Sequence, residues 1–128
     1  DDGIFSAGRL LEILAKSGKT LAELHDSVPA FESTPEIRVE CTDEEKFNIV
    51  AELVAAFKKE YDVVDVDGAR VQFGDGWGLV RASNTQPVLV LRFEAKSDAR
   101  LREIVAIFKK ALDRYPSVKY TAEDFYGY

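Results

Sequence analysis

The side chains best suited to binding a ligand lie in one short polar segment between two apolar stretches. Residues 81–87 read Arg-Ala-Ser-Asn-Thr-Gln-Pro, and the flanking residues 77–80 and 88–95 have the composition of β-strands. The segment offers a guanidinium, two hydroxyls and two amides, all able to donate hydrogen bonds, and its only charge is positive. This chemistry suits an oxyanion, most of all a phosphate held by a bidentate arginine. The candidate phosphate ligands are Arg81, Ser83, Asn84, Thr85 and Gln86.

The same segment also fits an ordinary hairpin loop, because Asn, Thr and Pro are common in turns. Short motifs often match by accident, so the residues alone leave both interpretations open. No carboxylate, histidine or lysine lies between Asp75 and Glu94, so the loop carries no evident group for proton transfer. Beyond the loop, Arg92 shares a strand face with Glu94 and is expected to pair with it rather than to bind a ligand.

Composition and charge argue against several classes of partner. The chain has 128 residues, of which 46% are hydrophobic, enough for one domain with a modest core. A net charge of −6 opposes binding to nucleic acid and to anionic membranes. No apolar run has transmembrane length and no signal peptide is evident. A single cysteine, Cys41, and a single histidine, His25, predict a cytoplasmic protein with no disulfide and no metal site in this chain.

Two segments precede the domain that must position the loop. Residues 1–28 carry two helical patterns, the second opened by a capping box of Thr20 and Glu23, and predict a helical hairpin with an apolar stripe. Residues 29–35 include two prolines and predict a linker. The loop-bearing domain is expected to cover residues 36–128. The chain contains no methionine, even at position 1, so we expect it to begin inside a longer polypeptide or to have been trimmed.

Within that domain the order of predicted elements is strand, helix, four strands, helix. Strands are predicted at residues 37–41, 63–66, 69–73, 77–82 and 88–95. The first helix is expected to begin after a capping box at Thr42 and to bury Phe47, Val50, Val54, Phe57 and Tyr61. The second is expected to be capped by Ser97, closed by Pro116, and to bury Leu101, Ile104, Val105, Phe108, Leu112 and Tyr115. Two amphipathic helices and an antiparallel sheet with one polar face predict a two-layer α+β domain.

The segment that follows Pro116 is rich in aromatic residues. Its members are Tyr120, Phe125, Tyr126 and Tyr128. We expect them to pack back on the sheet, and the sequence indicates no function for them.

A run of twenty residues around the loop matches a known family. Residues 76–95 read Gly-Trp-Gly-Leu-Val-Arg-Ala-Ser-Asn-Thr-Gln-Pro-Val-Leu-Val-Leu-Arg-Phe-Glu-Ala. This run closely resembles the C-terminal phosphate-binding loop of the α-D-phosphohexomutases, and its Ser-Asn-Thr form is most similar to the phosphomannomutase/phosphoglucomutase branch. It departs from the family at Gln86, where close relatives often have Thr or Glu. The resemblance implies a fourth domain with helices on one face of the sheet, similar in shape to the TATA-binding protein. It also implies that residues 1–28 are the helical end of a third domain.

In that family the whole enzyme moves phosphate between the 1 and 6 positions of a hexose. The resemblance implies phosphohexose partners, namely glucose or mannose phosphates and the 1,6-bisphosphate, together with the remaining domains of the enzyme. It also implies a magnesium ion bound in a domain that this chain lacks, and no cofactor here.

Nothing in the chain matches the family's phosphoserine loop or magnesium loop. We therefore expect the chain alone to be inactive and to clamp the phosphate that is not being transferred. The alternative is a non-catalytic interaction or structural domain that keeps the fold. A stand-alone enzyme is disfavoured, because no histidine, cysteine or carboxylate pair has catalytic spacing.

Overall fold

The computed structural model describes residues 2–126, with the side chain of Tyr126 excluded, and the chain divides into two compact units, Asp1–Ala30 and Phe31–Tyr128. The helices are α1 (Gly3–Ser17), α2 (Leu21–Asp26), α3 (Lys46–Phe57), α4 (Asp98–Leu112) and α5 (Ala122–Tyr126). The strands are β1 (Glu32–Ser33), β2 (Ile37–Glu40), β3 (Asp62–Val64), β4 (Ala69–Gln72), β5 (Gly76–Ala82) and β6 (Val88–Ala95).

The first unit consists of the two predicted helices. The Asp2 carboxylate caps α1 by accepting a hydrogen bond from the Phe5 amide at 2.8 Å, and α1 ends at Gly18 in the left-handed conformation. The predicted capping box of Thr20 and Glu23 is present at the start of α2. None of the described residues in these two helices is buried; Leu14 and Leu24 are half-buried, and other apolar side chains, such as Ile4 at 89% exposure, are exposed.

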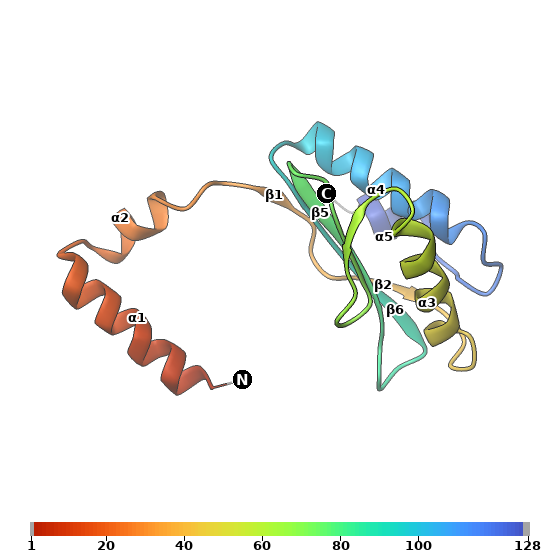
Figure 1. Cartoon of the computed structure of the whole chain (residues 1–128), viewed down its shortest axis with the longest axis horizontal. Helices are drawn as coiled ribbons and strands as arrows, with labels where there is room; N and C mark the ends of the chain where they lie inside the picture. The colour runs from red at the N-terminus through yellow and green to blue at the C-terminus, as the bar shows by residue number, and fades with distance from the viewer. Residues whose placement is uncertain (1, 127–128) are drawn as a thin grey trace. The chain divides into compact units, whose positions relative to one another are not determined.

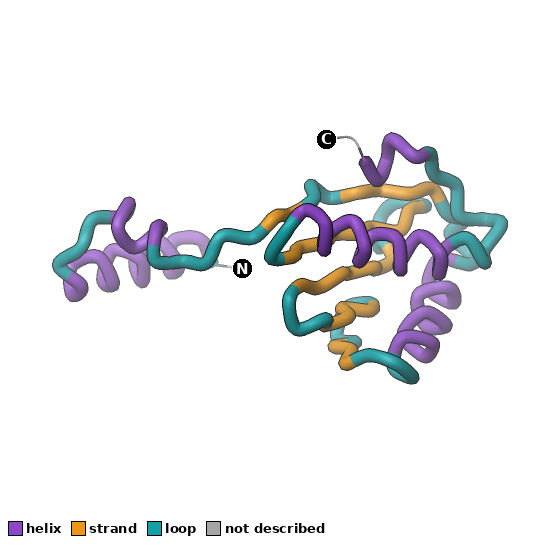
Figure 2. Tube along the Cα trace, turned by 90° about the horizontal axis from the view of Figure 1, so that it is seen from above, coloured by secondary structure: helices purple, strands orange, loops and turns teal. Residues whose placement is uncertain are grey.

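The second unit is built on a six-stranded antiparallel sheet. Its strand order is β1-β6-β5-β4-β3, and β2 also pairs with β6, on the same edge as β1. Figure 1 shows α3 and α4 on the same side of this sheet, and Figure 2 shows α4 running beside the strands. The two-layer α+β architecture and the order strand, helix, four strands, helix are therefore confirmed. The structure adds the short strand β1 before this series and the short helix α5 after it.

One face of the sheet forms the core with the helices. Alternate residues of β6 are fully buried. The predicted apolar residues within α4 are also buried, whereas Tyr115, which follows the helix, is half-buried. Gly78 lets β5 approach α4 closely, because a Cβ atom there would lie 2.5 Å from the Phe108 ring. The opposite face of the sheet carries both charged side chains, such as Arg81 and Arg92, and apolar ones, such as Leu79 and Val90. The loop of residues 83–87 joins β5 to β6 at one end of the sheet.

The edge of the sheet extends into the segment predicted as a linker. Glu32 and Ser33 pair with the end of β6, and the edge is interrupted at Thr34 before β2 continues it. Thr34 bridges the interruption, because its amide donates to the Phe93 carbonyl at 3.0 Å and its hydroxyl accepts from the Phe93 amide at 3.1 Å. The hydroxyl oxygen of Thr34 thus gives the buried Phe93 amide an acceptor where the strand pairing is interrupted.

The buried face of α3 differs from the predicted one. Phe47, predicted to be in the core, is 54% exposed, whereas Lys46 is buried. The helix also begins at Lys46 with no side-chain cap, and the Thr42 hydroxyl donates to the Glu45 carboxylate instead of capping the helix. The residues of α3 that are buried are Lys46, Ile49, Val50, Leu53 and Phe57.

The aromatic tail packs back on the domain, as predicted, where it is described. Phe125 is buried in the main core, and its ring lies 4.9 Å from the ring of Tyr120. Helix α5 contacts β2, on the side of the sheet that bears the core. Tyr128 and the side chain of Tyr126 lie outside the described residues.

Candidate functional site

The loop of residues 83–87 is closed by its own polar groups. The Ser83 amide donates to the Val88 carbonyl at 3.0 Å, and the Val88 amide donates to the Gln86 carbonyl at 2.9 Å. The Ser83 hydroxyl oxygen accepts from the amides of Thr85 and Gln86 at 3.4 and 3.2 Å. A hydroxyl that accepts two bonds still has its own proton to donate. Ser83 therefore orders the turn and keeps a donor for an external oxyanion.

Arg81 lies on the polar face of β5, one residue before the strand ends. Its neighbours Val80 and Ala82 are buried on the helix side, so alternation directs Arg81 to the other face. The side chain of Arg81 is 34% exposed, and its Nη1 lies 3.6 Å from Oδ2 of Asp67. The guanidinium is thus accessible to a ligand and already faces one carboxylate.

The turn between β3 and β4 brings Asp67 to this position. Gly68 follows it with φ +89°, a conformation that side chains other than glycine rarely adopt. A Cβ atom at Gly68 would lie 2.2 Å from the Val80 carbonyl oxygen and 2.8 Å from the Arg81 Cα. Only glycine therefore allows this turn to lie against the backbone of Arg81.

Gln86 is held by two cationic residues that the sequence analysis did not select. Arg38, on β2, donates from Nη1 to the side-chain oxygen of Gln86 at 2.6 Å. Lys46 donates from Nζ to the Gln86 main-chain carbonyl at 3.0 Å. No local pattern could have revealed either contact, because Gln86 is 48 positions from Arg38 and 40 from Lys46. The register that pairs Glu40 with Val88 brings the end of β2 beside the loop.

The five predicted ligands lie at one end of the β5–β6 hairpin, which forms the candidate surface. Arg81 and Ser83 are partly exposed, and Asn84, Thr85 and Gln86 are exposed. Arg92 lies on the same face as Arg81 and opposite Leu79. The expected pairing of Arg92 with Glu94 is wrong, because no ion pair joins them among the described residues. The surface can therefore offer a guanidinium, hydroxyl protons and amide protons to an oxyanion.

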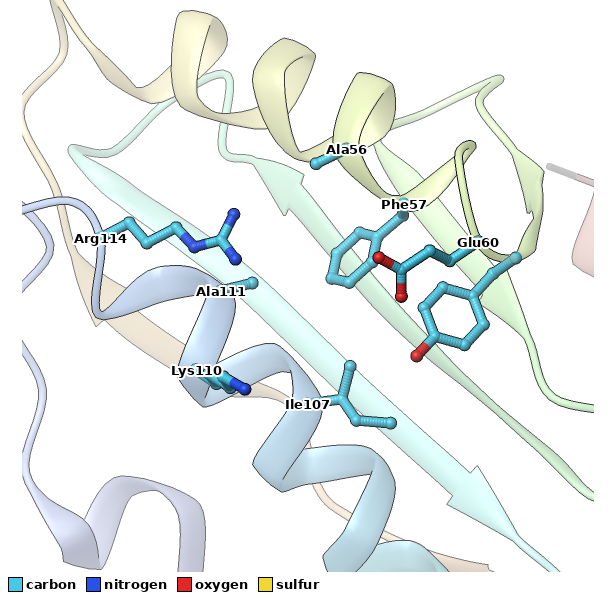
Figure 3. Close-up of a pocket in the computed structure, with 8 residues that line it drawn as sticks. Ala56, Phe57, Glu60, Ile107, Lys110, Ala111 and Arg114 are labelled. Atoms are coloured by element: carbon cyan, nitrogen blue, oxygen red, sulfur yellow. The ribbon is translucent and has the colours of Figure 1, made fainter.

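A separate pocket of about 230 Å³ lies between α3 and α4 (Figure 3). Its lining residues are Ala56, Phe57, Glu60, Tyr61, Ile107, Lys110, Ala111 and Arg114. None of the loop residues contributes to it. The oxyanion chemistry thus lies on an exposed loop, and the pocket between the helices is a different feature.

Cys41, the only cysteine in the sequence, has the surroundings of a structural residue. Cys41 is buried, and burial, with the nearby Glu45 carboxylate, raises the pKa of its thiol, which suits a core residue. Within residues 2–126 no three His, Cys, Asp or Glu side chains come together as metal ligands. No helix in the described part of the chain is long and apolar enough to cross a membrane.

The sequence of this chain matches a family of known proteins. Residues 36–111 match the family model described as phosphoglucomutase/phosphomannomutase, C-terminal domain. A phosphomannomutase/phosphoglucomutase of Pseudomonas putida is 52% identical over 115 residues, which cover 89% of this chain and 25% of that protein. A phosphoglucomutase of Neisseria gonorrhoeae is 41% identical over 119 residues, which cover 91% of this chain and 26% of that protein.

A solved structure agrees with the sequence matches. A phosphoglucomutase/phosphomannomutase family protein from Burkholderia thailandensis has a TM-score of 0.72 and 40% identity to this chain, covering 93% of it and 25% of that protein. The chain thus spans about a quarter of the length of the relatives it matches. The family model covers more than half of the chain, from the first residue before β2 to near the end of α4, and includes the loop. The chain therefore belongs to the phosphoglucomutase/phosphomannomutase family, of which it contains the C-terminal domain.

Proposed function

We propose that this chain is the phosphosugar-binding part of a cytoplasmic phosphomannomutase/phosphoglucomutase. In this proposal the parent enzyme, an isomerase, transfers phosphate between the 1 and 6 positions of a hexose. The loop clamps the phosphate that is not being transferred. The observation that carries the proposal is an accessible Arg81 beside a loop of hydroxyl and amide donors, with the cationic groups of Arg38 and Lys46 bonded to the loop at Gln86.

The chemistry of phosphoryl transfer allows one domain to bind phosphate while other domains carry out the transfer. That reaction depends mostly on positioning and on charge stabilisation, so a domain that only grips phosphate can contribute to it. A clamp that serves both orientations of the sugar must recognise phosphate and little of the ring. Arg81, Ser83, Asn84 and Thr85 offer donors for phosphate oxygens, and none of them needs the sugar to be oriented in one way.

Other domains of the parent enzyme would supply the rest of the chemistry. The phosphoserine and the magnesium ion implied by the family belong to those domains in this proposal. The loop itself is a set of donors, unlike the carboxylate and carbonyl oxygens that magnesium prefers. The ligands of the parent would be glucose or mannose phosphates and the 1,6-bisphosphate.

An NMR titration of this chain with glucose 1-phosphate, glucose 6-phosphate and inorganic phosphate tests the proposal. We expect dissociation constants on the order of millimolar, about −4 kcal/mol, because the contacts from the other domains are missing. The shifted amides should centre on residues 81–86. Arg81→Ala should abolish the response, because no other charge in the loop can hold a dianion. Unchanged binding by Arg81→Ala, or shifts centred elsewhere, would favour the alternative of an interaction or structural domain.

A further inference from the structure

Lys46 is a buried lysine at the first position of α3. Only 4% of its side-chain surface is exposed, while the next residue, Phe47, is largely in solvent. Burial of an ammonium group is costly unless it is paired and hydrogen-bonded. Helix α3 nevertheless buries Lys46 and exposes Phe47. The buried lysine must therefore make polar contacts that a phenylalanine could not make.

Two hydrogen bonds account for the buried ammonium, which also lies 5.2 Å from the centroid of the Phe47 ring. Nζ of Lys46 lies 2.5 Å from Oδ1 of Asp43 in the preceding turn and 3.0 Å from the carbonyl oxygen of Gln86 in the loop. The Asp43 side chain is 65% exposed, so water screens much of its charge. The second partner is a neutral carbonyl. The ammonium thus brings a positive charge within hydrogen-bonding distance of the loop, opposite one exposed carboxylate.

The bond to Gln86 fixes the end of the loop. The same carbonyl accepts from the Val88 amide, and the Gln86 amide donates to the Ser83 hydroxyl oxygen. Holding the Gln86 carbonyl therefore also restrains the neighbouring Gln86 amide, which donates to the Ser83 hydroxyl oxygen. A loop held in this way before a ligand arrives loses less conformational entropy on binding.

We infer that Lys46 is a positioning residue for the phosphate loop, which it orders through the Gln86 carbonyl and supports with its charge. The inference about ligand affinity rests on the proposed function, whereas the inference about loop order does not. Lys46 itself need not touch the ligand, because its Nζ is buried against Asp43 and Gln86.

The test compares Lys46→Met with Lys58→Met in the 128-residue chain. Lys58 is a matched control, because it loses the same charge from an exposed ion pair with Asp65 at the other end of α3. In ligand-free protein we expect Lys46→Met to speed amide hydrogen exchange at Gln86 and Val88, while Lys58→Met leaves it unchanged. With inorganic phosphate as the probe, Lys46→Met should raise the dissociation constant by at least about fivefold.

If Lys46 only stabilised the fold, its replacement would lower the melting temperature together with the phosphate affinity. Lys46→Met leaves no buried group unpaired, because the Asp43 carboxylate is 65% exposed and the Gln86 carbonyl still accepts from the Val88 amide. We therefore expect Lys46→Met to keep its melting temperature while it loses affinity. Lys46→Arg should recover part of the affinity, because it retains the charge and a donor. If Lys46→Met does not fold, Lys46→Gln is compared in its place, with the same expectation.

The outcomes separate this inference from the proposed function. If the unsubstituted chain binds no phosphate, the proposed function fails, and amide exchange alone then decides the role of Lys46. Exchange at Gln86 and Val88 that is the same in Lys46→Met and Lys58→Met overturns the inference. Phosphate affinity that is unchanged in Lys46→Met also overturns it.

Discussion

The carboxylate of Asp67 lies 3.6 Å from Nη1 of Arg81, so the guanidinium best placed to bind phosphate already faces a negative charge. Asp67 reaches this position through the turn at Gly68, and 72% of its side chain is exposed. Because both partners are accessible to water, the pair stabilises the fold little. A phosphate that binds Arg81 would nevertheless be repelled by the Asp67 carboxylate.

Asp67→Asn should therefore tighten phosphate binding by about two- to fivefold, since it removes one exposed like charge near the ligand. The dissociation constant is measured by NMR titration with inorganic phosphate at low ionic strength. Asp65→Asn is the control, because Asp65 lies two positions away and pairs with Lys58. Equal tightening in both variants would mean that net charge, and not the position of Asp67, is responsible.

Arg81→Lys should restore little of the binding that Arg81→Ala loses, because a point charge cannot replace a bidentate fork. Arg70→Ala is the matched control: Arg70 pairs with Leu79 on the neighbouring strand, and its guanidinium lies over the Trp77 ring, 4.4 Å from the ring centroid. We expect Arg70→Ala to bind glucose 1-phosphate as well as the unsubstituted chain does. Full binding by Arg81→Lys would show that charge alone recruits the ligand.

The isolated chain should bind glucose 1-phosphate and glucose 6-phosphate with similar affinity and interconvert neither. The reason is that, in the proposed function, the loop recognises phosphate and not the sugar ring. The chain also contains no match to the family's phosphoserine and magnesium loops. Turnover is measured against a mock preparation in the presence of magnesium. Turnover above that background, or strong preference for one sugar phosphate, would contradict this account.

Gly68→Ala should lower the free energy of unfolding by at least about 2 kcal/mol. The new Cβ atom would meet the backbone of Val80 and Arg81, which cannot move without breaking the β4–β5 pairing. Gly74→Ala is the control, because Gly74 also has positive φ but faces open space. Its cost should be smaller, about 1 kcal/mol, from backbone strain alone. Urea unfolding compares the two, and equal losses would show that the close approach at Gly68 is unimportant.

The free energy of unfolding should fall at high pH because the Tyr120 phenol loses its proton. Burial, together with the hydrogen bond from its hydroxyl to Asp113, raises the pKa of Tyr120 from 10 to about 12. A raised pKa means that the folded state favours the protonated phenol. The stability that this preference adds to the folded state is fully present below pH 10 and is lost as pH rises to about 12. Urea unfolding from pH 8 to 12 should show a steeper loss for the unsubstituted chain than for Tyr120→Phe. Parallel curves would contradict the shift.

Local sequence patterns determined most of the elements. The apolar spacing of α4 predicts its buried face because a helix of fifteen residues repeats its pattern over several turns. Alternation in β5 and β6, with the Ser-Asn-Thr segment between them, likewise predicts two strands and the loop that carries Arg81. These features follow from contacts within a few residues of chain, so the sequence alone was sufficient for them.

Tertiary structure decided which distant side chains meet the loop. Phe47 was expected inside, but Lys46, which was not among the predicted core residues, bonds to the carbonyl of Gln86 forty positions away and is the buried one. Asp67 reaches Arg81 only because a turn between two other strands packs against β5. Such pairings depend on strand order and register, which bring together groups that have no relationship along the chain. For that reason the sequence was sufficient to predict candidate ligand-binding residues, whereas the charged groups that surround them could be found only from the fold.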